Sequence, residues 1–191
     1  MKRRNLVIQY NAPVTLTFAL LSFGVLVLHW VTNGVSTSRV FSVYRSSLGD
    51  ILTYPRFFLH VLGHGSLAHY SGNITLMLVL GPGLEERYGS QNILWAMTVT
   101  AFVSGLLHWL FFPGTALLGA SGIVFMMILM ASLGGSRGGG IPLTLILVFV
   151  VYIGGELYDG LTLRDNISQL THVVGGICGA VLGILLRRGR K

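Results

Sequence analysis

Ser121 and His172 are two residues of types that could act together in nucleophilic catalysis. A serine hydroxyl is a weak nucleophile at neutral pH until a nearby base accepts its proton, and histidine is the side chain best matched to that task. The acid closest before His172 is Asp165, whereas Ser168 and Gln169 occupy the turn between them. The sequence therefore predicts a serine–histidine dyad rather than a triad completed by a carboxylate.

Donors for a developing negative charge are present in an earlier segment. Acyl transfer at a serine passes through a tetrahedral oxyanion, which preorganised hydrogen-bond donors stabilise. His69 and Asn73 are spaced so that both side chains project from one face of a helix. These two side chains and the backbone N–H of Ser121 could together form an oxyanion hole.

The elements that hold these residues are predicted to be membrane-spanning helices. The chain has 191 residues, of which 52% are hydrophobic and 10% charged, whereas soluble domains carry about 25% charged residues. A bilayer core about 30 Å thick requires roughly 20 mostly apolar residues in a helix. The sequence thus predicts an all-α, polytopic bundle of six transmembrane helices in one domain, residues 1–191. The predicted spans are 12–31, 67–84, 93–112, 115–133, 141–157 and 168–186.

The charged residues predict the orientation of the chain. Its net charge is +7, and the basic residues cluster at the chain ends beside apolar spans, which argues against a nucleic-acid-binding face. With both termini in the cytoplasm, the inner side carries the whole excess of positive charge, as the positive-inside rule requires. We therefore expect an integral membrane protein with cytoplasmic termini, and the short chain favours a prokaryotic inner membrane.

The same topology places the candidate residues at a common depth. The second, fourth and sixth predicted spans all run from outside to inside, and His69, Asn73, Ser121 and His172 lie near their starts. Each residue should therefore lie about 5 to 10 Å below the outer boundary. A single polar site that faces outward is expected.

Small residues indicate how two of these spans pack. Glycines surround Ser121 and recur every four residues after His172, and small-residue stripes allow membrane helices to approach closely. Such packing would press span six against span four and bring His172 to Ser121. The glycines are Gly119 and Gly122 around the serine, and Gly175, Gly179 and Gly183 after the histidine.

Taken in this order across six spans, the motifs resemble those of the rhomboid intramembrane serine proteases. The resemblance runs from about Arg56 to Gly183, and its further landmarks are Arg56, His60 and His64 before span two. Rhomboids often place tyrosine four residues after the serine. Phe125 keeps a ring that could stack on His172 but lacks the hydroxyl.

The resemblance implies both the reaction and the partners. Ser121 would be the nucleophile, His172 the base, and His69, Asn73 and the Ser121 amide the oxyanion hole. Arg56, His60 and His64 would be structural. The substrates would be single-span transmembrane proteins, cleaved near the outer membrane face with small residues at the cut. The lipid bilayer is the other partner, no cofactor or metal is implied, and the oligomeric state is open.

Three other interpretations compete with a protease. A rhomboid-like protein without catalysis could bind membrane helices, although the complete set of Ser121, His172, His69 and Asn73 argues against this. Intramembrane histidines can also relay protons in a transporter, but no acid or base continues a polar path through the inner half of the bilayer. The third alternative is a metal site at His60, His64 and His69, which no carboxylate or thiol accompanies.

Overall fold

The computed structural model describes residues 9–134, 143, 146–147 and 166–188, with only the backbone of 166–170 and 187–188. The described residues are mostly helical, which confirms the predicted all-α class apart from one pair of two-residue strands. The elements in chain order are α1 (Pro13–Val31), α2 (Val35–Arg39), β1 (Val43–Tyr44), α3 (Thr53–Leu59), the 3-10 helix η1 (His60–Leu62), α4 (Leu67–Tyr88), α5 (Ser90–Phe111), β2 (Ala116–Leu117), α6 (Ser121–Gly134) and α8 (Asn166–Arg188).

Four predicted spans coincide closely with helices α1, α4, α5 and α8. Helix α4 continues one turn beyond its predicted end at residue 84 and accommodates Pro82 in its interior. Among the described residues, α1 and α5 are long and apolar enough to cross a bilayer, and Ser121–Gly134 and Thr171–Leu186 form shorter apolar helices. The predicted span 141–157 lies almost entirely outside the described residues, so the count of six spans stays a prediction.

The predicted start of span four is wrong. The sequence predicts a span from residue 115, but α6 begins at Ser121. Phe112 follows the last residue of α5 and has φ −125° and ψ 68°, which is not a helical conformation. The next residue is Pro113, and a proline disfavours the helical conformation in the residue before it. Residues 112–120 then form a connection that contains β2 and a turn at Gly119 with φ +116°. Ser121 is therefore the first residue of its helix, not a residue inside it.

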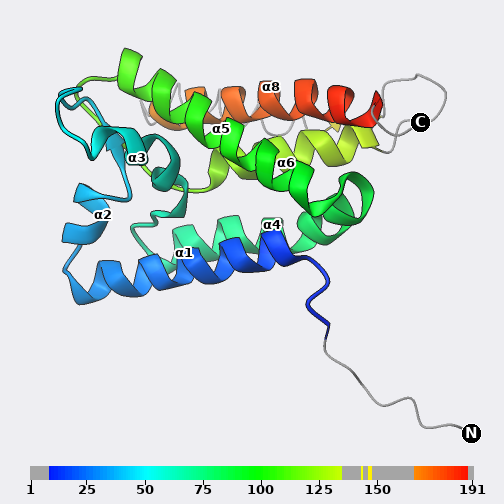
Figure 1. Cartoon of the computed structure of the whole chain (residues 1–191), viewed down its shortest axis with the longest axis horizontal. Helices are drawn as coiled ribbons and strands as arrows, with labels where there is room; N and C mark the ends of the chain where they lie inside the picture. The colour runs from blue at the N-terminus through cyan, green and yellow to red at the C-terminus, as the bar shows by residue number, and fades with distance from the viewer. Residues whose placement is uncertain (1–8, 135–142, 144–145, 148–165, 189–191) are drawn as a thin grey trace, which may run out of the picture.

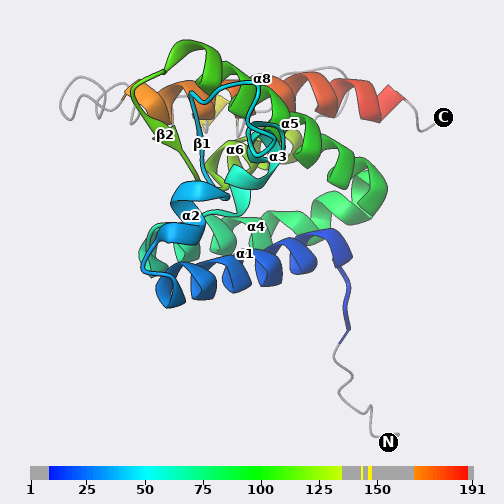
Figure 2. The same cartoon turned by 60° about the vertical axis from the view of Figure 1, so that its left-hand side comes forward.

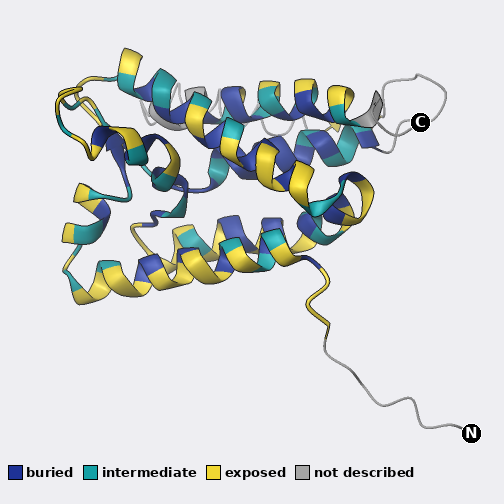
Figure 3. Ribbon diagram, in the orientation of Figure 1, coloured by how far each residue is buried: buried dark blue, intermediate teal, exposed yellow. Residues whose placement is uncertain are grey.

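The long helices form two layers, which Figures 1 and 2 show from two directions. One layer holds α1 and α4 side by side, and the other holds α5, α6 and α8. Helix α6 packs against α4, α5 and α8, and every residue from Gly122 to Ile128 is buried. A helix that is apolar on all sides belongs in the interior of a bundle. Figure 3 shows that α1, by contrast, exposes much of its surface.

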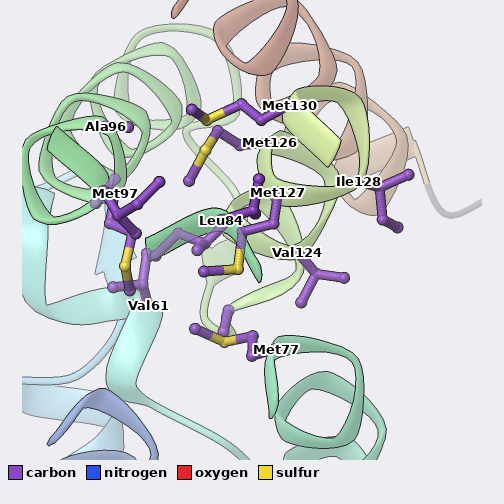
Figure 4. Close-up of a cluster of buried hydrophobic side chains, with 14 of the residues drawn as sticks. Val61, Met77, Leu84, Ala96, Met97, Val124, Met126, Met127, Ile128 and Met130 are labelled. Atoms are coloured by element: carbon purple, nitrogen blue, oxygen red, sulfur yellow. The ribbon is translucent and has the colours of Figure 1, made fainter. Parts of the chain in front are cut away.

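A methionine-rich core fills the space between the layers (Figure 4). Met77 of α4 and Met126, Met127 and Met130 of α6 are fully buried. Methionine is unbranched and flexible, so it fills irregular gaps between helices. The core thereby fixes α6 against α4, the two helices that carry Ser121, His69 and Asn73.

The connection between α1 and α4 is a structured segment. Its strand β1 pairs antiparallel with β2, with Val43 opposite Leu117. Arg56 is buried, donates from Nε to the Arg39 carbonyl at 2.7 Å and pairs through Nη1 with the Asp50 carboxylate at 2.9 Å. The backbone N–H of Leu52 and the guanidinium of Arg56 lower the pKa of Asp50. The segment is thus tied to itself and to the strand that precedes α6.

Glu85 fastens α1 to α4. Its side chain is buried and accepts hydrogen bonds from the N–H of Val14 at 3.2 Å and of Thr15 at 2.8 Å. The Thr15 hydroxyl donates to the same carboxylate at 2.7 Å. The residue that precedes α1, Ala12, has no capping side chain. A carboxylate from another helix therefore satisfies the open N–H groups of α1 and matches the positive end of its dipole.

Candidate active site

Ser121 opens α6 directly after a sharp turn. The turn residue Gly119 has φ +116°, a conformation that side chains with a Cβ rarely adopt. The N–H of Gly119 donates to the His60 carbonyl at 2.9 Å. The first hydrogen bond of α6 runs from the N–H of Val124 to the Ala120 carbonyl at 3.0 Å. The N–H groups of the first residues of a helix have no partner within it. Ser121 therefore combines a half-buried hydroxyl with a helix N-terminus.

His69 and Asn73 of α4 lie against this turn. A methyl group placed on Gly119 would be 2.7 Å from His69 Nε2 and 3.8 Å from Asn73 Nδ2. Ser66 precedes α4, and its hydroxyl accepts the N–H of His69 at 3.1 Å, which fixes the first turn of the helix. The structure thus brings together His69, Asn73 and the residues immediately before Ser121. Their role as an oxyanion hole stays a prediction.

His172 reaches the same place from α8. Its ring stacks on Phe125, with centroids 4.3 Å apart and planes inclined by 11°. Phe125 lies four residues after Ser121, so both project from one face of α6. Next to His172, the buried Thr171 packs its methyl group against Gly122. His172 therefore lies beside the N-terminal turn of α6, where Ser121 begins the helix.

The glycine stripe of α8 makes this position possible. A methyl group on Gly175 would collide with the carbonyl of Gly122, and one on Gly179 would collide with that of Met126. Lower in the helix, a methyl group on Gly183 would lie 3.5 Å from the Cα of Met130. The backbones of α8 and α6 are thus in direct contact, which is the close packing that the glycine spacing indicates.

The other predicted supporting residues belong to the α1–α4 connection. His60 is fully buried, and its Nε2 donates to the Ala101 carbonyl of α5 at 3.0 Å. His64 is fully buried as well and contacts Asn73 through a hydrogen bond of 3.2 Å. Arg56 bonds to Arg39 and Asp50, both within the connection. Within the described ranges no three histidine, cysteine or acidic side chains gather closely enough to hold a metal ion, and Asp165 lies outside those ranges.

Two contacts that position Ser121 have no sequence signal. The bond from Gly119 to the His60 carbonyl and the pairing of β1 with β2 both use backbone groups. Such groups are present in every residue, so composition and motif spacing do not reveal them. They join the turn before Ser121 to a segment more than fifty residues earlier in the chain.

Comparisons with known proteins identify a family that this chain resembles along most of its length. The rhomboid domain model matches residues 52–189. The rhomboid protease GlpG of Yersinia pestis and that of Yersinia pseudotuberculosis are each 29% identical to this chain over 175 residues, which cover 89% of this chain and 61% of the relative. The rhomboid protease GlpG of Pectobacterium atrosepticum is 27% identical over 179 residues, 91% of this chain and 63% of the relative.

The chain therefore spans less than two thirds of the length of these relatives. The family match nevertheless covers well over half of the chain, and it includes α4, α5, α6 and α8 with His69, Asn73, Ser121 and His172. The chain belongs to the rhomboid family.

Proposed function

We propose that the chain is an intramembrane serine endopeptidase that uses Ser121 as nucleophile and His172 as general base. One observation carries the proposal: His172 stacks on Phe125, one turn from Ser121, while His69 and Asn73 adjoin the turn that leads into Ser121. These are the groups that acyl transfer at a serine requires. The relatives' description as rhomboid proteases supports the same reaction.

In the proposed reaction, His172 accepts the proton of the Ser121 hydroxyl while its oxygen attacks the carbonyl carbon of the scissile peptide. The C–N bond breaks, and His172 returns the proton to the leaving amine. Water then attacks the acyl-enzyme while His172 accepts a proton from it, the ester bond to the Ser121 oxygen breaks, and His172 returns the proton to Ser121. The stacking on Phe125 restricts rotation of the imidazole ring, so Phe125 supports the base without taking part in proton transfer.

The negative charge of each tetrahedral intermediate would fall between two helices. The N–H of Ser121 belongs to the N-terminus of α6, where unsatisfied amides and the helix dipole favour an anion. The His69 and Asn73 side chains approach from α4 next to Gly119. Donors held in place before the reaction stabilise the oxyanion without any cost of reorganisation in the transition state.

The proposed substrates are single-span transmembrane proteins. A peptide bond within a helix is shielded by its neighbours, so the substrate helix has to open before Ser121 can attack it. Gly119, Ala120 and Gly122 around the serine leave little side-chain bulk, which lets the substrate backbone approach Ser121 closely. A preference for small residues at the cut is what the family resemblance implies. We further propose that the chain has six spans in a bacterial inner membrane with both termini in the cytoplasm, so that cleavage occurs near the outer face.

Cleavage of tagged single-span reporters in proteoliposomes tests the proposal. Ser121→Ala and His172→Ala should each abolish cleavage, because one removes the nucleophile and the other removes its base. Ser71→Ala and His29→Ala are matched controls. Ser71 is an exposed residue of α4, and His29, in the last turn of α1, hydrogen-bonds to Thr37 of α2. Both controls should cleave at the wild-type rate.

The outcomes separate the protease from its rival. Cleavage that persists in Ser121→Ala would overturn the proposed nucleophile. If the wild-type protein cleaves no reporter but retains reporters in a pull-down, and Ser121→Ala retains them equally well, a helix-binding protein without catalysis is the better description.

A further inference from the structure

His64 contacts both side chains of the candidate oxyanion hole, His69 and Asn73. It follows η1, immediately before α4 begins, and its side chain is fully buried. The ring meets His69 edge-on, with centroids 4.9 Å apart, and meets Tyr70 edge-on at 5.6 Å. Packing on two sides thus holds the imidazole in one orientation.

The hydrogen bonds of His64 define its tautomer. Nδ1 lies 3.1 Å from the Leu62 carbonyl, which can only accept, so Nδ1 carries the proton and donates it. Nε2 is then an acceptor, and it lies 3.2 Å from the Nδ2 amide nitrogen of Asn73. Both ring nitrogens of a neutral histidine are therefore satisfied by groups that complement them.

The surroundings keep this ring neutral. Burial is the main cause that lowers the pKa of His64 to about 4, and the neighbouring His69 is the second cause. A protonated ring would present an N–H at both nitrogens, and its Nε2 could no longer accept from Asn73. At neutral pH the acceptor that Asn73 needs is therefore present.

The bond determines which way the Asn73 amide faces. An asparagine amide has two N–H groups and one carbonyl oxygen, and rotation by half a turn exchanges them. Because Nε2 of His64 only accepts, it bonds the NH₂ end of Asn73 and excludes the flipped amide, whose oxygen would face another acceptor. One N–H is used by His64, and the second is left for another acceptor, while Nδ2 itself lies 3.8 Å from the place of a methyl group on Gly119.

We propose that His64 is a positioning residue that holds the Asn73 amide with its donor directed at the oxyanion. This inference rests on the proposed function, and it assigns His64 a catalytic consequence beyond joining the connection to α4. His64 touches no reacting atom and acts only through Asn73. Without it, the Asn73 amide can rotate and present its oxygen to a negative charge.

Two conservative substitutions separate the two hydrogen bonds of His64. In His64→Gln the longer amide places an oxygen near the former Nε2, so the acceptor for Asn73 is retained. In His64→Asn the shorter amide reaches the Leu62 carbonyl, but the acceptor for Asn73 is lost. The turnover number and KM of both variants should be measured with a reporter in proteoliposomes, together with their thermal unfolding.

We expect His64→Asn to lower the turnover number by roughly tenfold to a hundredfold with KM nearly unchanged, because loss or misplacement of one oxyanion donor has about that effect. His64→Gln should restore most of the rate. In the Asn73→Ala background, His64→Asn should lower the rate less than about twofold further, because a residue that acts only through Asn73 has nothing left to position.

The double-mutant cycle distinguishes the possible failures. If His64→Asn lowers the rate by the same factor in the presence and absence of Asn73, its effect is general destabilisation and the inference is overturned. The inference also fails if His64→Asn turns over like wild type while Asn73→Ala is defective, and the proposed function then stands. If Asn73→Ala itself is fully active while Ser121→Ala is inactive, both this inference and the oxyanion role of Asn73 fail, but the nucleophile does not.

Discussion

Replacing Gly175 with alanine should separate α8 from α6 at the level of the catalytic residues. A methyl group on Gly175 would collide with the Gly122 carbonyl oxygen, and it would lie 2.8 Å from the carbonyl carbon and 3.0 Å from the Cα of Gly122. Ordinary contacts of a Cβ begin at 3.4 Å. Every one of the crowded atoms is backbone, so no side chain can rotate away, and the helices must move apart by about 1 Å.

This displacement acts directly on the dyad, because Gly122 follows Ser121 and Gly175 lies one turn after His172. Misplacement of a reacting group by about 1 Å can lower a rate on the order of a hundredfold, and overpacking of this kind costs about 1 to 3 kcal/mol of stability. We therefore expect Gly175→Ala to lose most of its turnover number and to unfold at a lower temperature.

Gly176→Ala is the matched control. A methyl group there meets only Leu129 Cδ2 at 4.0 Å, and alanine in a helix is about 1 kcal/mol more favourable than glycine. Cleavage of a reporter in proteoliposomes and thermal unfolding in detergent should be measured for both variants. Should Gly175→Ala equal Gly176→Ala in rate and in unfolding temperature, the close contact between α8 and α6 does not hold the dyad in place.

Three further substitutions test other parts of the fold. Glu85→Ala should destabilise the protein by about 1 to 2 kcal/mol in thermal unfolding, because α1 loses its cap; no change would remove Glu85 from this role. The backbone N–H of Leu52 and the guanidinium of Arg56 lower the pKa of Asp50 from its ordinary 3.8, so the stabilisation by these contacts is present above about pH 4 and is lost as the pH falls through the lowered pKa. Thermal unfolding of Asp50→Asn should therefore differ from wild type at pH 7, and this difference should shrink as the pH falls through the lowered pKa of Asp50; a constant difference would contradict this. Gly119→Ala should abolish most cleavage, because its φ is +116° and a Cβ would meet His69, whereas Gly114→Ala, in open space, should remain active.

Those features that depend on local pattern could be predicted from the sequence. The bounds of α1 and α5 follow from the length of continuous apolar stretches, and the contact of α8 with α6 follows from glycines at helical spacing. The stacking of Phe125 on His172 is also accessible in this way, because Phe125 lies one turn after Ser121. Each of these inferences needs only the period of a helix and the size of a side chain.

The remaining features depend on partners far apart in the chain. Residues 115–120 are apolar enough to extend span four toward the N-terminus. The turn at Gly119 and the pairing of β1 with β2 prevent this, so the helix begins only at Ser121. The cap of α1 by Glu85 joins residues about seventy positions apart. Likewise, the orientation of Asn73 depends on the tautomer of His64, which the Leu62 carbonyl determines. Hydropathy and motif spacing do not contain this information.

The most direct test of the central claim is covalent labelling of the proposed nucleophile. The protein in proteoliposomes would be treated with a fluorophosphonate, which reacts with an activated serine, and the modified residue would be located by peptide mass spectrometry. We expect an adduct on Ser121 that His172→Ala abolishes, while labelling persists in His29→Ala. An adduct on another serine, or labelling of Ser121 that does not depend on His172, would contradict the dyad.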